Sequence, residues 1–205
     1  MSSYKLRYFD GRGRAEMIRL CLAATGANYE DIRMNFEQWT KFKPSTIAGH
    51  MPILEVDGKQ LAEADAIAKF VGREHGLAGE GNWEMAQIDM IFGICTDLRK
   101  ELFETHFEKD EKVKAEKIEK LKKEVLPKFL DIFEKILESN GKGDRFLVGS
   151  SVTVADIVVF DVLDLAASKG LVDFKEHPKM DCFKKKVAEL PRIAEYLKLR
   201  PNSNM

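Results

Sequence analysis

The chain has 205 residues, of which 44% are hydrophobic and 33% charged, so it is too apolar for a disordered chain and too charged for a membrane bundle. Its 33 lysine and arginine residues balance its 34 acidic residues, which excludes the electrostatic footprint of a nucleic-acid-binding protein. No apolar run approaches the ~18 residues of a membrane span, and the polar start is not typical of a signal peptide. The three cysteines are odd in number and widely spaced, which argues against a disulfide framework. We therefore expect a soluble protein of a reducing compartment, with neither nucleic acid nor membrane as partner.

The first eighty residues carry the patterns of a small α/β unit. Helical spacing after residue 14 predicts a helix that stops at Gly26, and a second helix is expected from about Ala64 to Gly76. Residues 35–50 lack periodicity and are expected to form a long loop containing no more than a helical turn. The Asp57-Gly58 pair is a hairpin signal. Strand patterns occupy residues 4–9, 29–34, 52–56 and 59–62.

From about residue 82 onward the strand patterns vanish, and apolar side chains recur at spacings of three and four. The mostly charged segment 108–124 is interpreted as a solvated helix face with i,i+4 ion pairs, in preference to a charged docking surface. Pro127 should kink this helix or start a new one. Two further helices are expected over residues 153–169 and 179–198.

The two parts meet at a glycine-rich, polar stretch near residues 76–82, which is typical of a domain boundary. We therefore predict an α/β domain over residues 1–79 and an all-helical domain over residues 82–205.

Three placements in the sequence could carry a function. Tyr8 ends the first predicted strand before a glycine-containing loop, where its hydroxyl could reach a ligand, although a half-buried core tyrosine is commoner there. Met51-Pro52 precedes a strand; spacing alone favours a trans bond, whereas a cis bond would present the Met51 backbone to an extended peptide. Thr153 and Asp156 have the spacing of a helix capping box, which is a folding signal.

The residues offer no sign of metal or phosphate chemistry. The four histidines have no metal-ligand spacing, and together with the scattered cysteines they build no zinc site. The sequence also lacks a phosphate loop, a Gly-x-Ser-x-Gly motif and a paired-carboxylate arrangement. The residues alone thus indicate a two-domain soluble protein with a strand edge that accepts a peptide.

Taken in order, these and other motifs resemble the cytosolic glutathione S-transferases over essentially the whole chain. Details such as YKLRYFDGRGRAE and PILEVDG are similar to the sigma class, which includes invertebrate detoxification enzymes and the glutathione-dependent prostaglandin D synthase. The motifs that carry the resemblance are Tyr8, Arg12-Gly13-Arg14-Ala15-Glu16, Trp39, the stretch from Gly49 to Gly58, the Thr153/Asp156 box, and Lys198-Leu199-Arg200-Pro201.

The resemblance implies the glutathione S-transferase fold: an α/β thioredoxin-like N-terminal domain followed by an all-α C-terminal domain that carries the electrophile pocket. It also implies a cytoplasmic homodimer that adds glutathione to hydrophobic electrophiles, with an isomerase or peroxidase side activity. A non-catalytic ligand carrier or lens crystallin on the same fold is the alternative. Retention of Tyr8, Arg14, Trp39 and Lys43 favours the enzyme.

The family's catalytic tyrosine corresponds to Tyr8, and Arg14 corresponds to a residue that polarises the same site. A free thiol has a pKa of ~8.5 and is mostly protonated at neutral pH. A phenol hydrogen bond to the thiolate favours the charged form and so raises the concentration of the nucleophile.

The resemblance also implies the glutathione-binding residues. Trp39 and Lys43 correspond to residues that hold the glycine carboxylate, and Met51, presented by a cis Pro52, corresponds to the residue whose backbone pairs with the cysteinyl part. Asp97 corresponds to an acid that reaches the glutamyl ammonium bound by the opposite subunit. The remaining residues at binding positions are Gly49, His50, Glu63 and Ala64.

Some residues differ from the family pattern. Glu63-Ala64 stands where the family has Gln or Glu and then Ser. Ala64 therefore keeps the N–H that binds the glutamyl carboxylate but lacks the serine hydroxyl. Asp65 adds a negative charge nearby. His50 stands where Lys or Gln is common. Gly93 and Thr96 replace the acids that accompany Asp97 in the metal cluster of the prostaglandin synthase, so we expect glutathione as co-substrate and no metal.

Overall fold

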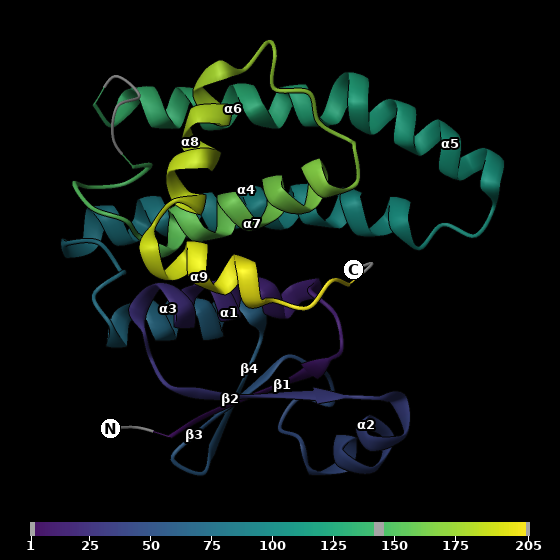
Figure 1. Ribbon diagram of the computed structural model, residues 1–205, viewed down its shortest axis with the longest axis vertical. Helices are drawn as coiled ribbons and strands as arrows, with labels where there is room; N and C mark the ends of the chain where they lie inside the picture. The colour runs from purple at the N-terminus through teal and green to yellow at the C-terminus, as the bar shows by residue number, and fades with distance from the viewer. Residues whose placement is uncertain (1–2, 142–145, 204–205) are drawn as a thin grey trace. The chain divides into compact units, whose positions relative to one another are not determined.

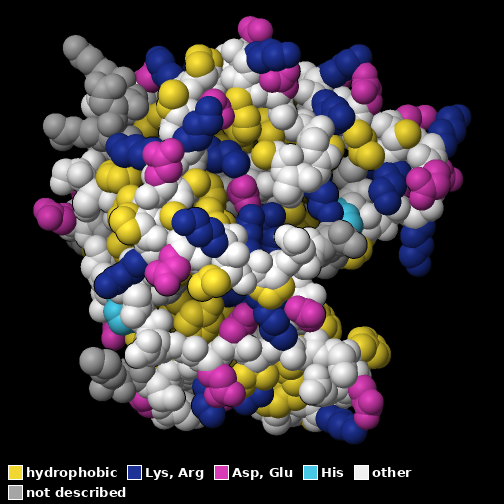
Figure 2. Space-filling model, viewed as in Figure 1, with side chains coloured by type: hydrophobic (Ala, Val, Ile, Leu, Met, Phe, Trp, Pro, Cys, Tyr) yellow, Lys and Arg dark blue, Asp and Glu magenta, His cyan; other side chains and the backbone are white. Residues whose placement is uncertain are grey.

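The computed structural model describes residues 3–141 and 146–203. Two compact units make up the chain: the first contains the residues up to Leu77 together with those from Leu190 onward, and the second is Ala78–Glu189. The predicted boundary divides the chain in the same region, but the prediction assigned the last residues to the helical part. Acidic and basic side chains intermingle on the face seen in Figure 2, and no helix in the described part of the chain is long and apolar enough to cross a membrane.

A four-stranded mixed sheet is the centre of the first unit. The central strand β1 runs parallel to β2 and antiparallel to β3, and β3 continues through a tight hairpin into β4. Asp57 and Gly58 occupy that turn with φ of 48° and 81°, as the Asp-Gly signal predicts. The strands, in the spatial order β2-β1-β3-β4, are β1 (Tyr4–Phe9), β2 (Tyr29–Met34), β3 (Ile53–Val56) and β4 (Lys59–Ala62).

Two predicted helices of this unit are confirmed. Helix α1 (Glu16–Thr25) ends at Gly26, whose φ of 67° suits a residue without a Cβ, and α3 (Ala64–Glu74) begins at Ala64 as expected. Helix α1 packs against both α3 and the last helix, α9 (Pro191–Leu199), and Figure 1 shows the three on the same side of the sheet.

The expectation of a loop over residues 35–50 is wrong for its first part, because residues Phe36–Phe42 form helix α2. Asn35 caps this helix: its Oδ1 accepts the Gln38 N–H at 2.9 Å, and Gln38 Oε1 accepts the Asn35 N–H at 2.9 Å. A reciprocal cap of this kind stabilises a short helix whose apolar periodicity is weak. A short 3-10 turn, η2 (Lys43–Ser45), follows.

The second unit is helical throughout its described regular structure. Most of the charged segment 108–124 forms α5, which has no buried side chain, in agreement with a solvated face, whereas Leu121 just after it is buried. Pro127 lies in the first turn of α6, as predicted. Between them, Leu121–Val125 forms a π-helical turn, η3. The helices are α4 (Gly81–His106), α5 (Glu111–Lys120), α6 (Leu126–Ser139), α7 (Val154–Ser168) and α8 (Pro178–Ala188).

The single helix predicted over residues 179–198 is in fact two, α8 and α9. Leu190 adopts an extended backbone with ψ of 126° immediately before Pro191, which starts α9. A residue that precedes proline is pushed out of the helical region, so the break occurs where the sequence contains a proline in an otherwise helical pattern. The break also coincides with the end of the second unit.

The capping box of α7 is confirmed and lies in the core. Both Asp156 and Thr153 are buried; the Asp156 carboxylate accepts the Thr153 N–H at 2.7 Å, the Thr153 hydroxyl at 3.0 Å and the Leu147 N–H at 2.8 Å. Burial nevertheless raises the pKa of Asp156 to about 6, and the three hydrogen bonds oppose that rise. This carboxylate therefore ties the segment before α7 to the helix start.

The pKa of Asp156 predicts a pH dependence of stability. Because the folded-state pKa lies above the unfolded value, the folded protein retains a proton between about pH 4 and pH 6 that the unfolded chain has lost, so this group's contribution to stability decreases as pH rises through that range. Compared with Asp156→Asn, which cannot ionise, the wild type should lose about 1 kcal/mol of relative unfolding free energy between pH 5 and pH 7. Urea titrations of both proteins measure this difference. A difference that stays constant over this range contradicts the raised pKa.

Candidate active site

Tyr8 lies in β1, one residue before the strand ends, and its side chain is 9% exposed. Its hydroxyl oxygen accepts the backbone N–H of Arg14 at 3.2 Å. An oxygen that accepts one hydrogen bond still has its own proton to donate, so the arrangement leaves the Tyr8 proton available to a ligand. The structure thus brings the predicted tyrosine and the Arg14 backbone together.

Gly13 makes this approach possible, a role that the sequence patterns did not indicate. Its φ is 43°, and a Cβ at this position would lie 2.5 Å from the Tyr8 hydroxyl oxygen. Any side chain would therefore displace the hydroxyl. The available signal was a glycine five residues after a strand-end tyrosine, in the loop that leads into a helix.

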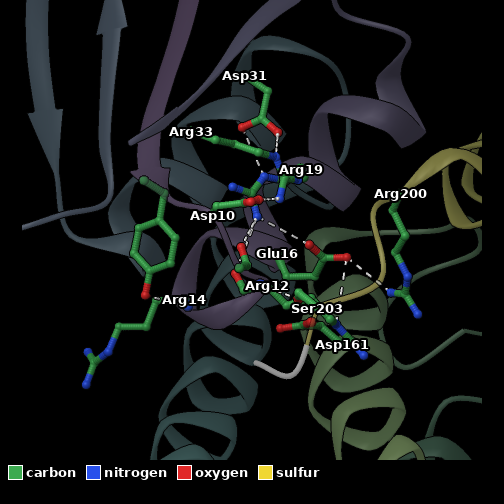
Figure 3. A network of polar contacts seen from close by, with 12 residues as sticks. Asp10, Arg12, Arg14, Glu16, Arg19, Asp31, Arg33, Asp161, Arg200 and Ser203 are labelled. Carbon is green, nitrogen blue, oxygen red and sulfur yellow. Dashed lines mark hydrogen bonds and ion pairs between the residues drawn. The ribbon is translucent and has the colours of Figure 1, made fainter. Parts of the chain in front are cut away.

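The Arg14 side chain is exposed, and Figure 3 shows it extending away from the other labelled charged side chains. The structure describes a hydrogen bond to Tyr8 from the Arg14 main chain. The polarising role expected of its guanidinium stays a prediction.

Trp39 lies on α2, and Lys43 is the first residue of the turn η2 that follows it. The Trp39 ring is buried and packs edge-on against Phe9, which directly follows Tyr8, with a ring-centroid distance of 6.4 Å. The Phe42 ring also lies against Trp39, with a ring-centroid distance of 6.5 Å, and the Arg7 guanidinium lies 4.6 Å from the centre of the Phe42 ring. This aromatic cluster fixes the Trp39 ring relative to the Tyr8 strand end.

The Met51-Pro52 peptide bond is cis, so the trans bond favoured by spacing alone is wrong and the expectation from the family resemblance is correct. The bond lies between a loop and the start of β3, and both residues are buried. In the loop, Gly49 has a φ of 68° and donates its N–H to the Thr46 hydroxyl at 3.0 Å.

His50 and Glu63 form a pair that links this loop to the start of α3. The His50 Nε2 lies 2.8 Å from a Glu63 carboxylate oxygen, and its Nδ1 lies 2.8 Å from the Ala48 carbonyl oxygen. His50 therefore contacts both its own loop and the residue before α3 through its two ring nitrogens. Glu63 itself has a φ of 68°, which is a strained conformation for a residue with a side chain. Strain of this kind is typical of functional sites.

Ala64, at the first position of α3, is buried, and its helix N-terminus supplies backbone N–H groups that suit a carboxylate. Asp97 belongs to the second unit, where it is exposed on α4. Among the described residues, no group of three or more His, Cys, Asp or Glu side chains could hold a metal ion.

Two family models match the chain: the N-terminal domain of glutathione S-transferases over residues 4–73, and their C-terminal domain over residues 96–200. The chain therefore belongs to the glutathione S-transferase family. The mixed sheet and its helices are the thioredoxin-like domain of that fold, and the second unit is its helical domain, as the sequence predicts.

Individual relatives support this assignment. The chain is 37% identical to glutathione S-transferase 4 of Caenorhabditis elegans over 99% of both chains, and 32% identical to S-crystallin SL11 of Nototodarus sloanii over 99% of both. A solved prostaglandin synthase D of Nilaparvata lugens has a TM-score of 0.87 at 32% identity, covering 98% of this chain and 100% of that one. The chain is accordingly an enzyme, a glutathione transferase.

The close approach at Gly13 generates a prediction. Gly13→Ala should lower glutathione-conjugating activity about tenfold or more, because its Cβ displaces the Tyr8 hydroxyl and small misplacements of reacting groups are costly. Gly76→Ala is the matched control, since Gly76 also has a positive φ, of 78°, and an added Cβ there meets no atom within 4 Å. Steady-state assays after thermal melts compare the two. Equal activities in both variants would contradict the displacement of the Tyr8 hydroxyl, because only the Gly13 variant places a Cβ against it.

Proposed function

We propose that this glutathione transferase activates the thiol of glutathione with the hydroxyl of Tyr8. The observation that carries the proposal is the hydrogen bond from the Arg14 N–H to the Tyr8 oxygen, which directs the tyrosine proton away from the loop. Donated to a bound thiolate, that proton stabilises the charged form and raises its concentration at neutral pH.

Glutathione would be held along the edge formed by α2, the cis-proline loop and the start of α3. Trp39 and Lys43 hold the glycine carboxylate, and the backbone of Met51 pairs with the cysteinyl part. The N-terminus of α3 at Ala64 receives the glutamyl carboxylate. His50 and Glu63 close this end of the site through the contact between His50 Nε2 and the Glu63 carboxylate.

We place the protein in the sigma class, as a cytoplasmic homodimer in which Asp97 of one subunit offsets the glutamyl ammonium bound by the other. The likeness to a prostaglandin synthase D supports this class and an isomerase side activity. The helical unit would carry the pocket for hydrophobic electrophiles, which makes detoxification the role.

A crystallin-like, non-catalytic role is the second candidate, because the chain also resembles an S-crystallin over its full length. The two roles differ in measurable ways. Retention on glutathione-agarose together with turnover of a chlorodinitrobenzene substrate supports the transferase, whereas absence of turnover supports the crystallin-like role.

Tyr8→Phe should lower conjugation turnover about ten- to a thousandfold while glutathione affinity falls much less, because one charge-assisted hydrogen bond of roughly 1.5–3 kcal/mol acts chiefly on thiol ionisation. The pH–rate profile should shift to higher pH as the thiol returns to its free pKa. Steady-state kinetics across pH 6 to 9 measure both effects. Unchanged turnover at pH 6.5 would remove Tyr8 from the mechanism.

Ala64→Ser should tighten glutathione binding by roughly ten- to a hundredfold, because a restored hydroxyl supplies a hydrogen bond of about 1.5–3 kcal/mol to a carboxylate. Saturated turnover should change little, since the glutamyl end is remote from the thiol. Ala66→Ser is the matched control, since Ala66 is exposed in the same helical turn. Calorimetric titration compares the three proteins. Equal dissociation constants for wild type and Ala64→Ser would mean that another group already satisfies that oxygen.

A further inference from the structure

The loop that carries the Arg14 N–H accepts hydrogen bonds from one buried side chain. Arg19, on α1, is fully buried, and its Nη1 donates to the Gly11 carbonyl at 2.7 Å and reaches the Arg12 carbonyl at 3.5 Å. These two carbonyls belong to the residues immediately before Gly13. The position of Arg19 therefore sets the path of the loop up to the group that contacts Tyr8.

Arg19 is itself fixed by two carboxylates (Figure 3). Its Nε donates to Asp31 at 3.1 Å, and its Nη1 lies 3.5 Å from Glu16. Asp31 also accepts from Arg33 at 2.9 Å, and Arg33 reaches Asp10 at 3.0 Å. A buried guanidinium keeps its place only while such partners offset its desolvation.

The C-terminal segment supplies two further partners of Glu16, whose side chain is 1% exposed and whose Oε1 also lies 3.9 Å from Arg12 Nε. The Tyr196 hydroxyl donates to Glu16 Oε2 at 3.0 Å, and Arg200 Nη1 donates to Oε1 at 3.1 Å. Burial and the neighbouring Glu16 charge raise the pKa of Tyr196, so its hydroxyl keeps its proton and stays a donor. Farther along the chain, the Ser203 hydroxyl accepts the Arg12 N–H at 3.3 Å.

We propose that the C-terminal segment 196–203 positions the thiol-activating hydroxyl of Tyr8 through Glu16 and Arg19, with Arg200 as the positioning residue. The inference rests on the proposed function of Tyr8. Segments from the two ends of the chain meet here: the tail contacts Glu16 and the Arg12 backbone, and Arg19 carries the constraint to the loop that presents the Arg14 N–H.

The physical basis is the distribution of charge around Glu16. With Arg200 present, Glu16 Oε1 faces Arg200 at 3.1 Å and Arg12 Nε at 3.9 Å, and Oε2 faces Tyr196 and Arg19. Loss of the Arg200 cation leaves a buried carboxylate short of positive charge, and Glu16 then moves closer to its remaining cations, Arg12 and Arg19. A closer Glu16–Arg19 pair competes with the Gly11 and Arg12 carbonyls, so the loop loosens and the Tyr8 hydroxyl is less well oriented.

The test measures kcat/KM for chlorodinitrobenzene against pH at saturating glutathione, because this profile reports the thiol pKa in the enzyme–glutathione complex. Arg200→Gln should shift the profile to higher pH by about half a unit to one unit, and lower the rate at pH 6.5 about three- to tenfold. Arg200→Lys keeps a cation near Glu16 and should restore most of the rate. The glutathione dissociation constant should stay near that of wild type.

Arg192→Gln is the matched control. Arg192 also anchors the tail, but it donates to the Thr25 carbonyl at the far end of α1, so its loss loosens α9 without touching Glu16. The inference is overturned if Arg200→Gln leaves the profile unchanged, or if Arg192→Gln shifts it equally.

Tyr8→Phe in the same assay separates the two proposals: a shift with Tyr8→Phe but none with Arg200→Gln refutes only the positioning role. No shift with Tyr8→Phe refutes the proposed function itself, and the inference with it.

Discussion

The burial of Arg19 is the constraint on which the first unit depends. A guanidinium removed from water is tolerated only when carboxylates and carbonyls surround it, and breaking such an arrangement typically costs about 3–5 kcal/mol. Here Asp31 comes from β2, Glu16 from α1 and the Gly11 carbonyl from the loop after β1. One side chain thereby ties a strand, a helix and the loop beside Tyr8 into a single arrangement.

Around Arg19, the candidate site is assembled from short local features of the chain. Gly13 leaves room for the Tyr8 hydroxyl, and the reciprocal cap at Asn35 forms the helix that carries Trp39. The cis bond before Pro52 lies just before β3, and Glu63, with its positive φ, lies just before α3. None of these features is a long helix or strand. Rigid strands and helices hold them, which is typical of binding sites built on loops.

The helical unit is organised around α7, whose side chains are apolar on nearly every face and largely buried. Such a helix needs a defined start, because uniform hydrophobicity gives no register along its length. Asp156 and Thr153 provide that start inside the core. A second buried pair, Arg99 with Asp161 at 2.9 Å, joins α7 to α4. These polar contacts thus specify how α7, whose surface is otherwise largely apolar, packs in the helical unit.

The sequence by itself determined the strands, the hairpin at Asp57-Gly58, the Gly26 helix stop and the α7 capping box, because each depends on periodicity or on a preference of nearby residues. It also indicated Tyr8 and the start of α3. It missed α2, since a cap compensated for weak periodicity, and the break at Pro191. Only the tertiary structure decided that Arg19 is buried, that Glu16 binds residues 180 positions or more away, and that Gly13 lies against Tyr8. Those contacts join distant parts of the chain, and no local pattern encodes them.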